Sequence, residues 1–123
     1  MVDEIASDAG IRREVFFKAE CLQNTGSFKI RGAMNAISRI PEDSLPNGVV
    51  THSSGNHGRA VAAAAKLFGI KASVVVPNDT PPNKIAHIKS HGALVVTCEP
   101  TQTARNTTCY ELAQSTSVGV GQC

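Results

Sequence analysis

Short apolar segments typical of buried β-strands alternate with helix-like segments through most of the second half of the chain. Parallel strands need long crossovers, and a helix is the usual one. The alternation therefore predicts an α/β fold with a parallel sheet flanked by helices, although three strands are few for a free-standing doubly wound sheet. The expected strands are 49–51, 71–76 and 93–97, and the expected helices are 56–68, 83–91 and 103–115.

Two boundaries in this part have clear chemical signals. Gly69 is expected to close the first helix as a left-handed C-cap, and Pro77 is expected to end the second strand. The alanine-rich run 60–65 is expected to form a buried helix face. In the last helix, Tyr110 and Leu112 are the expected apolar contacts.

The first part of the chain gives weaker signals. Residues 1–14 are polar and mixed, which favours a frayed arm or a poor helix, and 15–18 has the bulky composition of a short strand. The segment 24–26 is an expected turn. Apolar spacing over 27–40 predicts a helix that Ser27 caps.

This arrangement puts Lys29 in the first turn of a helix. The positive end of the helix dipole disfavours an ammonium there, and shielding from water would lower the lysine pKa further. A neutral amine is the form that attacks a carbonyl to make a Schiff base. The alternative is an ordinary lysine that points into solvent.

The loop 53–56 follows a strand and opens a helix. Open α/β sheets bind ligands at the carboxyl ends of their strands, and a free helix start binds anions. The carboxylate of an amino acid would fit such a site. A capped turn without a ligand is the competing interpretation.

Composition excludes several classes of function. The chain has 123 residues, 41% apolar and 18% charged, with a net charge of +2, which predicts one small soluble domain. We expect no nucleic-acid partner, because basic residues are scattered, and no membrane partner, because no apolar stretch is long enough. No secretory pattern occurs, so we expect a cytoplasmic protein with reduced cysteines.

Metal binding has little support in the sequence. His87 and His91 have the i, i+4 spacing that zinc can use, but no third ligand is evident, and we predict no metal site. His52 and His57 flank the loop and are expected to shape it. Cys98 is expected to pack rather than to react.

Two motifs occur in order: Ser27-Phe28-Lys29-x-Arg31-Gly32 and Ser53-Ser54-Gly55-Asn56-His57-Gly58. Together they resemble the fold-type II pyridoxal-phosphate (PLP) enzymes, in particular the serine racemase and threonine dehydratase family. The resemblance implies a three-layer parallel-sheet fold like that of tryptophan synthase β. It assigns 1–47 to part of a large, lysine-bearing domain and 48–123 to a small α/β domain.

The resemblance also implies roles for matching positions. Lys29 would hold PLP as a Schiff base and act as a base on one face, and Phe28 would wall the cofactor. Asn56 would bind the PLP phenolic oxygen. Ser53, Ser54, Asn56 and His57 would hold the substrate carboxylate, with Ser54 as the acid or base on the opposite face. The implied reactions convert L-serine to D-serine and deaminate serine or threonine to a 2-oxo acid and ammonia.

The sequence lacks several features of this family, which bears on the expected activity. ATP and Mg²⁺ bind in this family, and Thr25 matches a nucleotide contact, but Asn24 and Arg59 depart from the pattern there. No run of glycines that could grip the PLP phosphate is present. We therefore expect a partial or truncated chain, with a homodimer possible. The alternatives are a non-catalytic fragment, a threonine dehydratase, and a small anion-binding domain without PLP.

Overall fold

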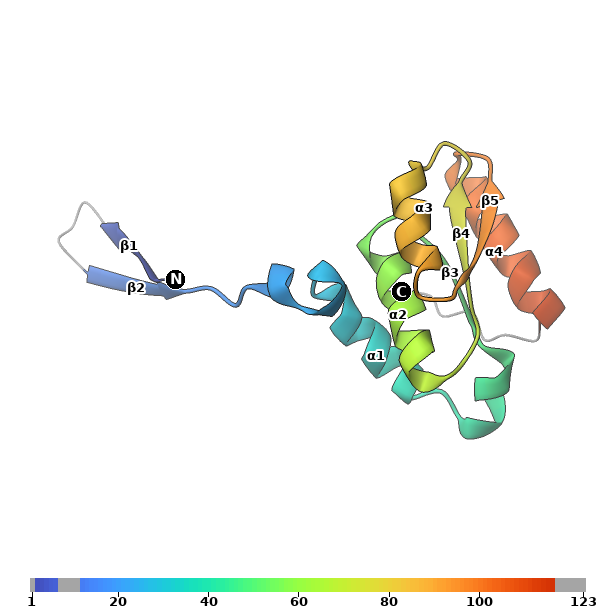
Figure 1. Ribbon diagram of the computed structural model, residues 1–123, viewed down its shortest axis with the longest axis horizontal. Helices are drawn as coiled ribbons and strands as arrows, with labels where there is room; N and C mark the ends of the chain where they lie inside the picture. The colour runs from blue at the N-terminus through green and yellow to red at the C-terminus, as the bar shows by residue number, and fades with distance from the viewer. Residues whose placement is uncertain (1, 7–11, 117–123) are drawn as a thin grey trace.

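The computed structural model describes residues 2–6 and 12–116, and Figure 1 shows their arrangement. Short 3₁₀ turns η1 (Glu20–Leu22), η2 (Asn24–Gly26) and η3 (Glu42–Asn47) connect the larger elements of the first half. The strands and α-helices are, in order, β1 (Val2–Ala6), β2 (Arg12–Phe16), α1 (Lys29–Ser38), β3 (Val49–His52), α2 (Asn56–Phe68), β4 (Ala72–Pro77), α3 (Pro82–Lys89), β5 (Leu94–Cys98) and α4 (Gln102–Thr116).

The central sheet is parallel, as the alternation predicts. Its strand order is β3-β4-β5, with Val49 opposite Ala72 and Val74 opposite Val95. Every strand of this sheet is followed by a helix, so the chain returns over the sheet before each new strand. The α/β class expected from the sequence is confirmed.

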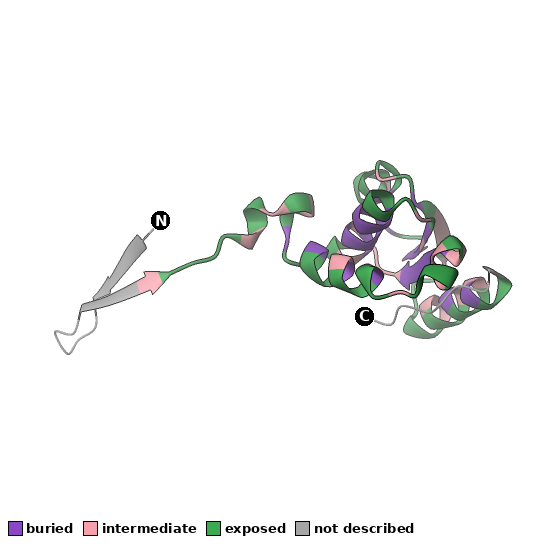
Figure 2. Ribbon diagram, turned by 90° about the horizontal axis from the view of Figure 1, so that it is seen from below, coloured by how far each residue is buried: buried purple, intermediate pink, exposed green. Residues whose placement is uncertain are grey.

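Successive strand residues face opposite sides of the sheet, and each side has its own apolar cluster. Val49, Val74 and Val76 join α1, α2 and α3 on one side. Val50 and Val75 join α4 on the other. The result is three layers, and buried residues concentrate on the inner surfaces of the helices and on the sheet (Figure 2).

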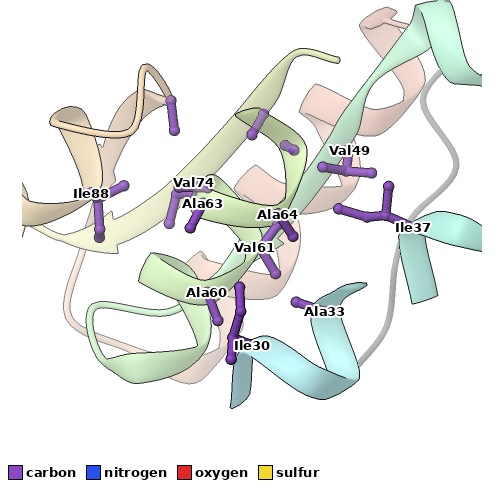
Figure 3. Packing of buried hydrophobic residues seen from close by; sticks show 14 of the residues in the cluster. Ile30, Ala33, Ile37, Val49, Ala60, Val61, Ala63, Ala64, Val74 and Ile88 are labelled. Carbon is purple, nitrogen blue, oxygen red and sulfur yellow. The ribbon is translucent and has the colours of Figure 1, made fainter. Parts of the chain in front are cut away.

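Helix α2 is the centre of the larger cluster because its small residues allow close packing. Ala60, Val61 and the alanines to Ala65 are all buried, as the run 60–65 predicts. The buried face of α1, formed by Ile30, Ala33 and Ile37, packs against α2 (Figure 3). The lysine helix is therefore fixed to the same core as the sheet.

Two glycines set the ends of α2. Gly69 has φ +67° and closes the helix as expected, because residues with a Cβ rarely adopt that conformation. At the other end, a Cβ on Gly58 would overlap the carbonyl oxygen of Ser53 and meet Val74 Cγ1 at 3.0 Å. The loop after β3 thus lies directly against the first turn of α2.

The expectation of a frayed arm or poor helix over 1–14 is wrong. Val2–Ala6 and Arg12–Phe16 pair as an antiparallel ribbon, with Val2 opposite Phe16. Figure 1 shows this ribbon extending away from the three layers. The expected strand at 15–18 is displaced toward the N-terminus, because its residues pair with a partner that the local pattern does not reveal.

Ser27 is not the helix cap that the sequence predicts. It is extended (φ −162°, ψ 164°), the N-cap is Phe28, and α1 begins at Lys29. The helix ends before Pro41, as expected. Tyr110 is also misassigned, since it is 58% exposed while Cys109 and Ala113 contact the sheet.

The short Gly-rich segment 118–123, which the sequence marks as a tail after the last helix, lies outside the described residues. Within the described ranges, no helix is both long and apolar enough to cross a membrane.

Candidate active site

The loop between β3 and α2 forms one half of the candidate site. The Ser53 amide donates to the Val75 carbonyl (3.0 Å), and the Gly55 amide donates to Ser53 Oγ (3.2 Å). These bonds fix the loop at the carboxyl end of the sheet, where ligands of open α/β folds bind. Ser54 is partly exposed and Asn56 exposed, so both side chains are accessible.

The start of α2 has backbone amides that donate to no acceptor among the described residues. Its N-cap, Gly55, provides no side-chain acceptor, and the first backbone amide with an acceptor is that of Arg59, which donates to Gly55 (3.2 Å). Among residues 2–6 and 12–116, nothing accepts from the amides of 56–58. Free amides and the helix dipole make this end suited to an anion, as the sequence predicts.

Lys29 lies at the start of α1 and is exposed. Its Nζ lies 5.1 Å from the centroid of the Phe28 ring, and that ring is itself 58% exposed. The ammonium thus sits over an aromatic face, an attractive arrangement. The shielding from water on which the sequence argument depends is absent around Lys29 in this structure.

His57 connects the two halves of the candidate site, which are the β3–α2 loop and the Lys29 end of α1. Burial lowers its pKa, and the positive charge of Lys29, followed by that of His52, lowers it further. Lys29 therefore lies within electrostatic reach of the first turn of α2, although 28 positions separate it from His57 in the sequence. Nε2 of His57 is buried and has no hydrogen-bond partner in the described structure. The imidazole is neutral at neutral pH and has one nitrogen available.

Thr25, in the turn before α1, carries backbone strain. The expected turn at 24–26 is confirmed, but Thr25 has φ +69° as well as Gly26 at +70°. A left-handed conformation is unfavourable for a residue with a Cβ, above all a branched one. The Thr25 and Ser27 hydroxyls are buried without partners among the described residues.

An ion pair that the sequence did not reveal links Glu20 to α1 across this turn. Arg31 Nη1 lies 2.6 Å from Glu20 Oε1, and Lys18 Nζ lies 3.5 Å from the same oxygen. Burial raises the Glu20 pKa, but the hydrogen bond from Arg31 and the charge of Lys18 outweigh it and hold the pKa below its usual value. No sequence pattern links residues 11 apart with an irregular segment between them.

The remaining candidates lie away from this site. His87 is on α3 and His91 follows it; no group of three or more metal-ligating side chains occurs among the described residues. Cys98 packs against the cluster beneath α4, as expected.

Known proteins resemble this chain in sequence and structure. The family model described as "Pyridoxal-phosphate dependent enzyme" matches residues 2–121. Serine racemase of Homo sapiens is 49% identical over 107 residues, covering 85% of this chain and 32% of that protein. Serine racemase of Dictyostelium discoideum is also 49% identical, over 105 residues, with the same coverage.

Solved structures agree. The crystal structure of the Dictyostelium discoideum serine racemase has a TM-score of 0.82 at 48% identity, covering 87% of this chain and 35% of that one. Threonine deaminase isoform 2 from Solanum lycopersicum has a TM-score of 0.79 at 34% identity, covering 85% of this chain and 31% of that one. The chain spans about a third of the length of the relatives it matches.

Proposed function

Because the chain belongs to the pyridoxal-phosphate-dependent enzymes and has their fold-type II α/β architecture, we propose that it takes part in PLP-dependent racemisation and deamination of serine. Serine racemases and threonine deaminases are among its relatives. The proposed reactions convert L-serine to D-serine, and serine or threonine to a 2-oxo acid and ammonia. The observation that carries the proposal is that the charge of Lys29, at the start of α1, acts on His57 in the first turn of α2.

The described residues fit part of the cofactor. Lys29 presents an accessible amine, and Phe28 beside it offers an exposed aromatic face. The exposed Asn56 side chain suits the cofactor's ring oxygen, and Nε2 of His57 is buried without a hydrogen-bond partner among the described residues. For the phosphate, the described residues offer no glycine-rich loop between a strand and a helix.

When bound, PLP stabilises negative charge at the substrate α-carbon. The protein must then move the α-proton. We assign the amine of Lys29 to one face and the hydroxyl of Ser54 to the other. The substrate carboxylate would bind the free amides of 56–58 and the Ser53 hydroxyl, with the neutral imidazole of His57 as an additional partner.

Ser54 favours racemisation over simple deamination. Inverting a carbon centre requires that a proton leave from one side and return on the other, so a second acid or base is necessary. The Ser54 hydroxyl makes no hydrogen bond within the described residues and is partly exposed. A dehydratase needs no such group.

The domain division, assembly and regulation are also proposals. We assign 1–47 to part of a large domain and 48–123 to a small domain, in a cytoplasmic homodimer. The unpartnered hydroxyl of Thr25 supports a nucleotide contact there, with ATP and Mg²⁺ as the ligands of the family. Asn24 and Arg59 are the two residues that depart from the family pattern at this nucleotide site.

The test is an absorption spectrum of the purified chain with PLP, beside Lys29→Ala and the control Lys71→Ala, which removes an exposed lysine elsewhere. A band of lysine-linked PLP in the wild type and control, absent in Lys29→Ala, supports the proposal. Borohydride reduction followed by peptide mapping should place the adduct at Lys29.

Assays of D-serine and pyruvate then measure turnover. Spectra without a difference between wild type and Lys29→Ala would contradict the proposal for this chain. They would instead support the interpretation of a non-catalytic fragment of a PLP enzyme.

A further inference from the structure

Strand β5 forms an open edge of the parallel sheet. It lies at one end of the order β3-β4-β5, and among the described strands only β4 pairs with it (Figure 1). The strand at the other end, β3, is covered, since Val49, Val50 and Thr51 are all buried. On β5, by contrast, Leu94 is 60% exposed and Thr97 is exposed. The accessible edge of the sheet is therefore that of β5.

The backbone of β5 determines which groups face this edge. The amide of Asn78, the residue after β4, donates to the Cys98 carbonyl (2.8 Å), so Cys98 turns its backbone groups toward β4. Backbone groups of successive residues alternate between the two edges of a strand. Val96 therefore also faces β4, whereas Val95 and Thr97 face away from it. No backbone group in the described part of the chain pairs with these outward groups.

The sequence of β5 lacks the features that protect a free edge from pairing. Natural edge strands often contain a lysine, a proline or a bulge, which stops another strand from adding to the sheet. The residues of β5 are Leu, Val, Val, Thr and Cys, so none is charged and none is proline. The register with β4 runs without a bulge from Ser73–Leu94 to Pro77–Cys98. This composition favours pairing with a further strand.

A second copy of β5 fits the edge in antiparallel orientation. With a two-fold axis at Val96, Val95 of one copy lies opposite Thr97 of the other. These two residues have the outward backbone groups, so each free amide of one copy meets a free carbonyl of the other. The same register places Leu94 opposite Cys98. Both lie on the α4 side of the sheet, because Cys98 belongs to the cluster there and Leu94 is four positions earlier in the strand.

The charges beside β5 favour this orientation over a parallel one. Lys89 and His91 precede the strand, and the exposed Glu99 follows it directly. Antiparallel pairing brings Glu99 of one copy to the basic end of the other copy's strand, where opposite charges attract. Parallel pairing would place the two Glu99 carboxylates side by side, and like charges repel. Charge and hydrogen-bond register thus select the same arrangement.

We propose that the open edge of β5 is a self-association surface, at which two copies of the chain pair through antiparallel β5 strands. The pairing joins two three-stranded sheets into one continuous sheet. It gives the proposed homodimer an interface and concerns assembly rather than chemistry. Failure of this inference would leave the proposed reaction unaffected, and failure of the proposed reaction would leave this inference unaffected.

The first experiment measures self-association of the full chain by sedimentation between about 10 μM and 1 mM. The wild type should shift from monomer to dimer as the concentration rises. Leu94→Lys puts a charge on the edge and should raise the dissociation constant by about tenfold or more. The control Leu67→Lys alters a leucine on α2 that is 70% exposed, and should leave the constant unchanged. A monomeric wild type, a species larger than a dimer, or equal effects of the two variants overturns the proposal.

The second experiment tests the register with a disulfide. Leu94→Cys adds a thiol opposite Cys98 of the second copy, at a pair without direct hydrogen bonds, where Cβ atoms approach closely enough for the bond. With oxidised glutathione as the electron acceptor, a covalent dimer should form, and peptide mapping should show a link between positions 94 and 98. The control Leu67→Cys should form no link to Cys98. A Leu94→Cys variant that sediments like the wild type but forms no such link would contradict the proposed pairing.

Discussion

The scaffold around α2 and the segment that leads into Lys29 differ in side-chain burial and in backbone strain. Around α2, valines and alanines are buried on both sides of the sheet, and Gly58 and Gly69 occupy positions where a side chain would clash or be strained. Between residues 16 and 28, Phe16, Phe17, Leu22 and Phe28 are all more than half exposed. The same segment contains the strained Thr25 and two buried hydroxyls without described partners.

The contrast distinguishes a region that supports the fold, around α2, from the segment that presents the candidate lysine. Apolar packing gives α2 its position, whereas backbone strain and exposed apolar side chains gather where the lysine is presented. Buried polar atoms without partners occur in both regions, at Thr25 and Ser27 and on α2 at His57 and Arg59. If this division is right, equivalent substitutions should have unequal effects in the two regions.

The largest contrast should come from removing an apolar side chain. Ile88→Ala should lower the free energy of unfolding by about 2–5 kcal/mol, because Ile88 is 1% exposed and its loss leaves a cavity. Leu22→Ala removes a side chain of the same size that is 85% exposed, and should cost no more than about 0.5 kcal/mol. Urea unfolding measures both. Equal losses would mean that the lysine segment is packed as tightly as the scaffold.

Two glycines give the next contrast. Gly58→Ala forces a methyl group against the Ser53 carbonyl and should cost about 1–3 kcal/mol. Gly32→Ala has open space around the new methyl and lies inside α1, so it should stabilise the chain by about 0.4–1 kcal/mol. Thermal melts of the two variants would check the opposite signs. A harmless Gly58→Ala would show that the loop can move away from α2.

Sequence reasoning succeeded where a local signal determines the outcome. The bounds of α2 were predicted because Gly69 and the alanine run depend on nothing distant, and the parallel sheet followed from crossover length. It failed where the outcome depends on a distant partner. Ribbon pairing of β1 with β2 and the contact of Arg31 with Glu20 are both of that kind.

The failures at Ser27 and Tyr110 have another cause. Serine suits a cap, but the Ser27 hydroxyl is buried and accepts no hydrogen bond from the amides of α1 among the described residues. In α4, small residues rather than the aromatic one meet the sheet, because Cys109 and Ala113 allow a closer approach. For the candidate site, the two motifs pointed to the starts of α1 and α2. The lowered pKa of His57 could not be predicted from the sequence, because it depends on burial and on the charge of Lys29 from another helix.

Thr25 should show a smaller effect of opposite sign to most substitutions. Thr25→Gly removes a left-handed strain of about 1–2 kcal/mol but adds about 0.5–1 kcal/mol of unfolded-state entropy, leaving a net gain of up to about 1.5 kcal/mol. The neighbouring Asn24 does not have a positive φ. Asn24→Gly therefore raises the entropy of the unfolded chain without relieving any backbone strain, and should destabilise the protein. Chemical unfolding of both variants provides the measurement. Destabilisation by Thr25→Gly would mean that the threonine side chain has a compensating contact.

The smallest effect should come from the ion pair that ties the lysine segment to α1. The Glu20 carboxyl is held ionised by Arg31 and Lys18, so its pKa is lower in the folded chain and its contribution is present above the unfolded value of about 4.5 and lost as the pH falls through the folded value. Arg31→Gln should flatten this acidic part of the stability curve and reduce its dependence on salt, because exposed pairs are weak and screened. Arg39→Gln removes an equal charge from an exposed residue at the other end of α1 and should leave the curve unchanged. Unfolding curves between about pH 3 and pH 6 at low and high salt measure both variants. Parallel curves for the two would mean that net charge, rather than the pair, sets the response, and that the lysine segment is held to α1 by packing alone.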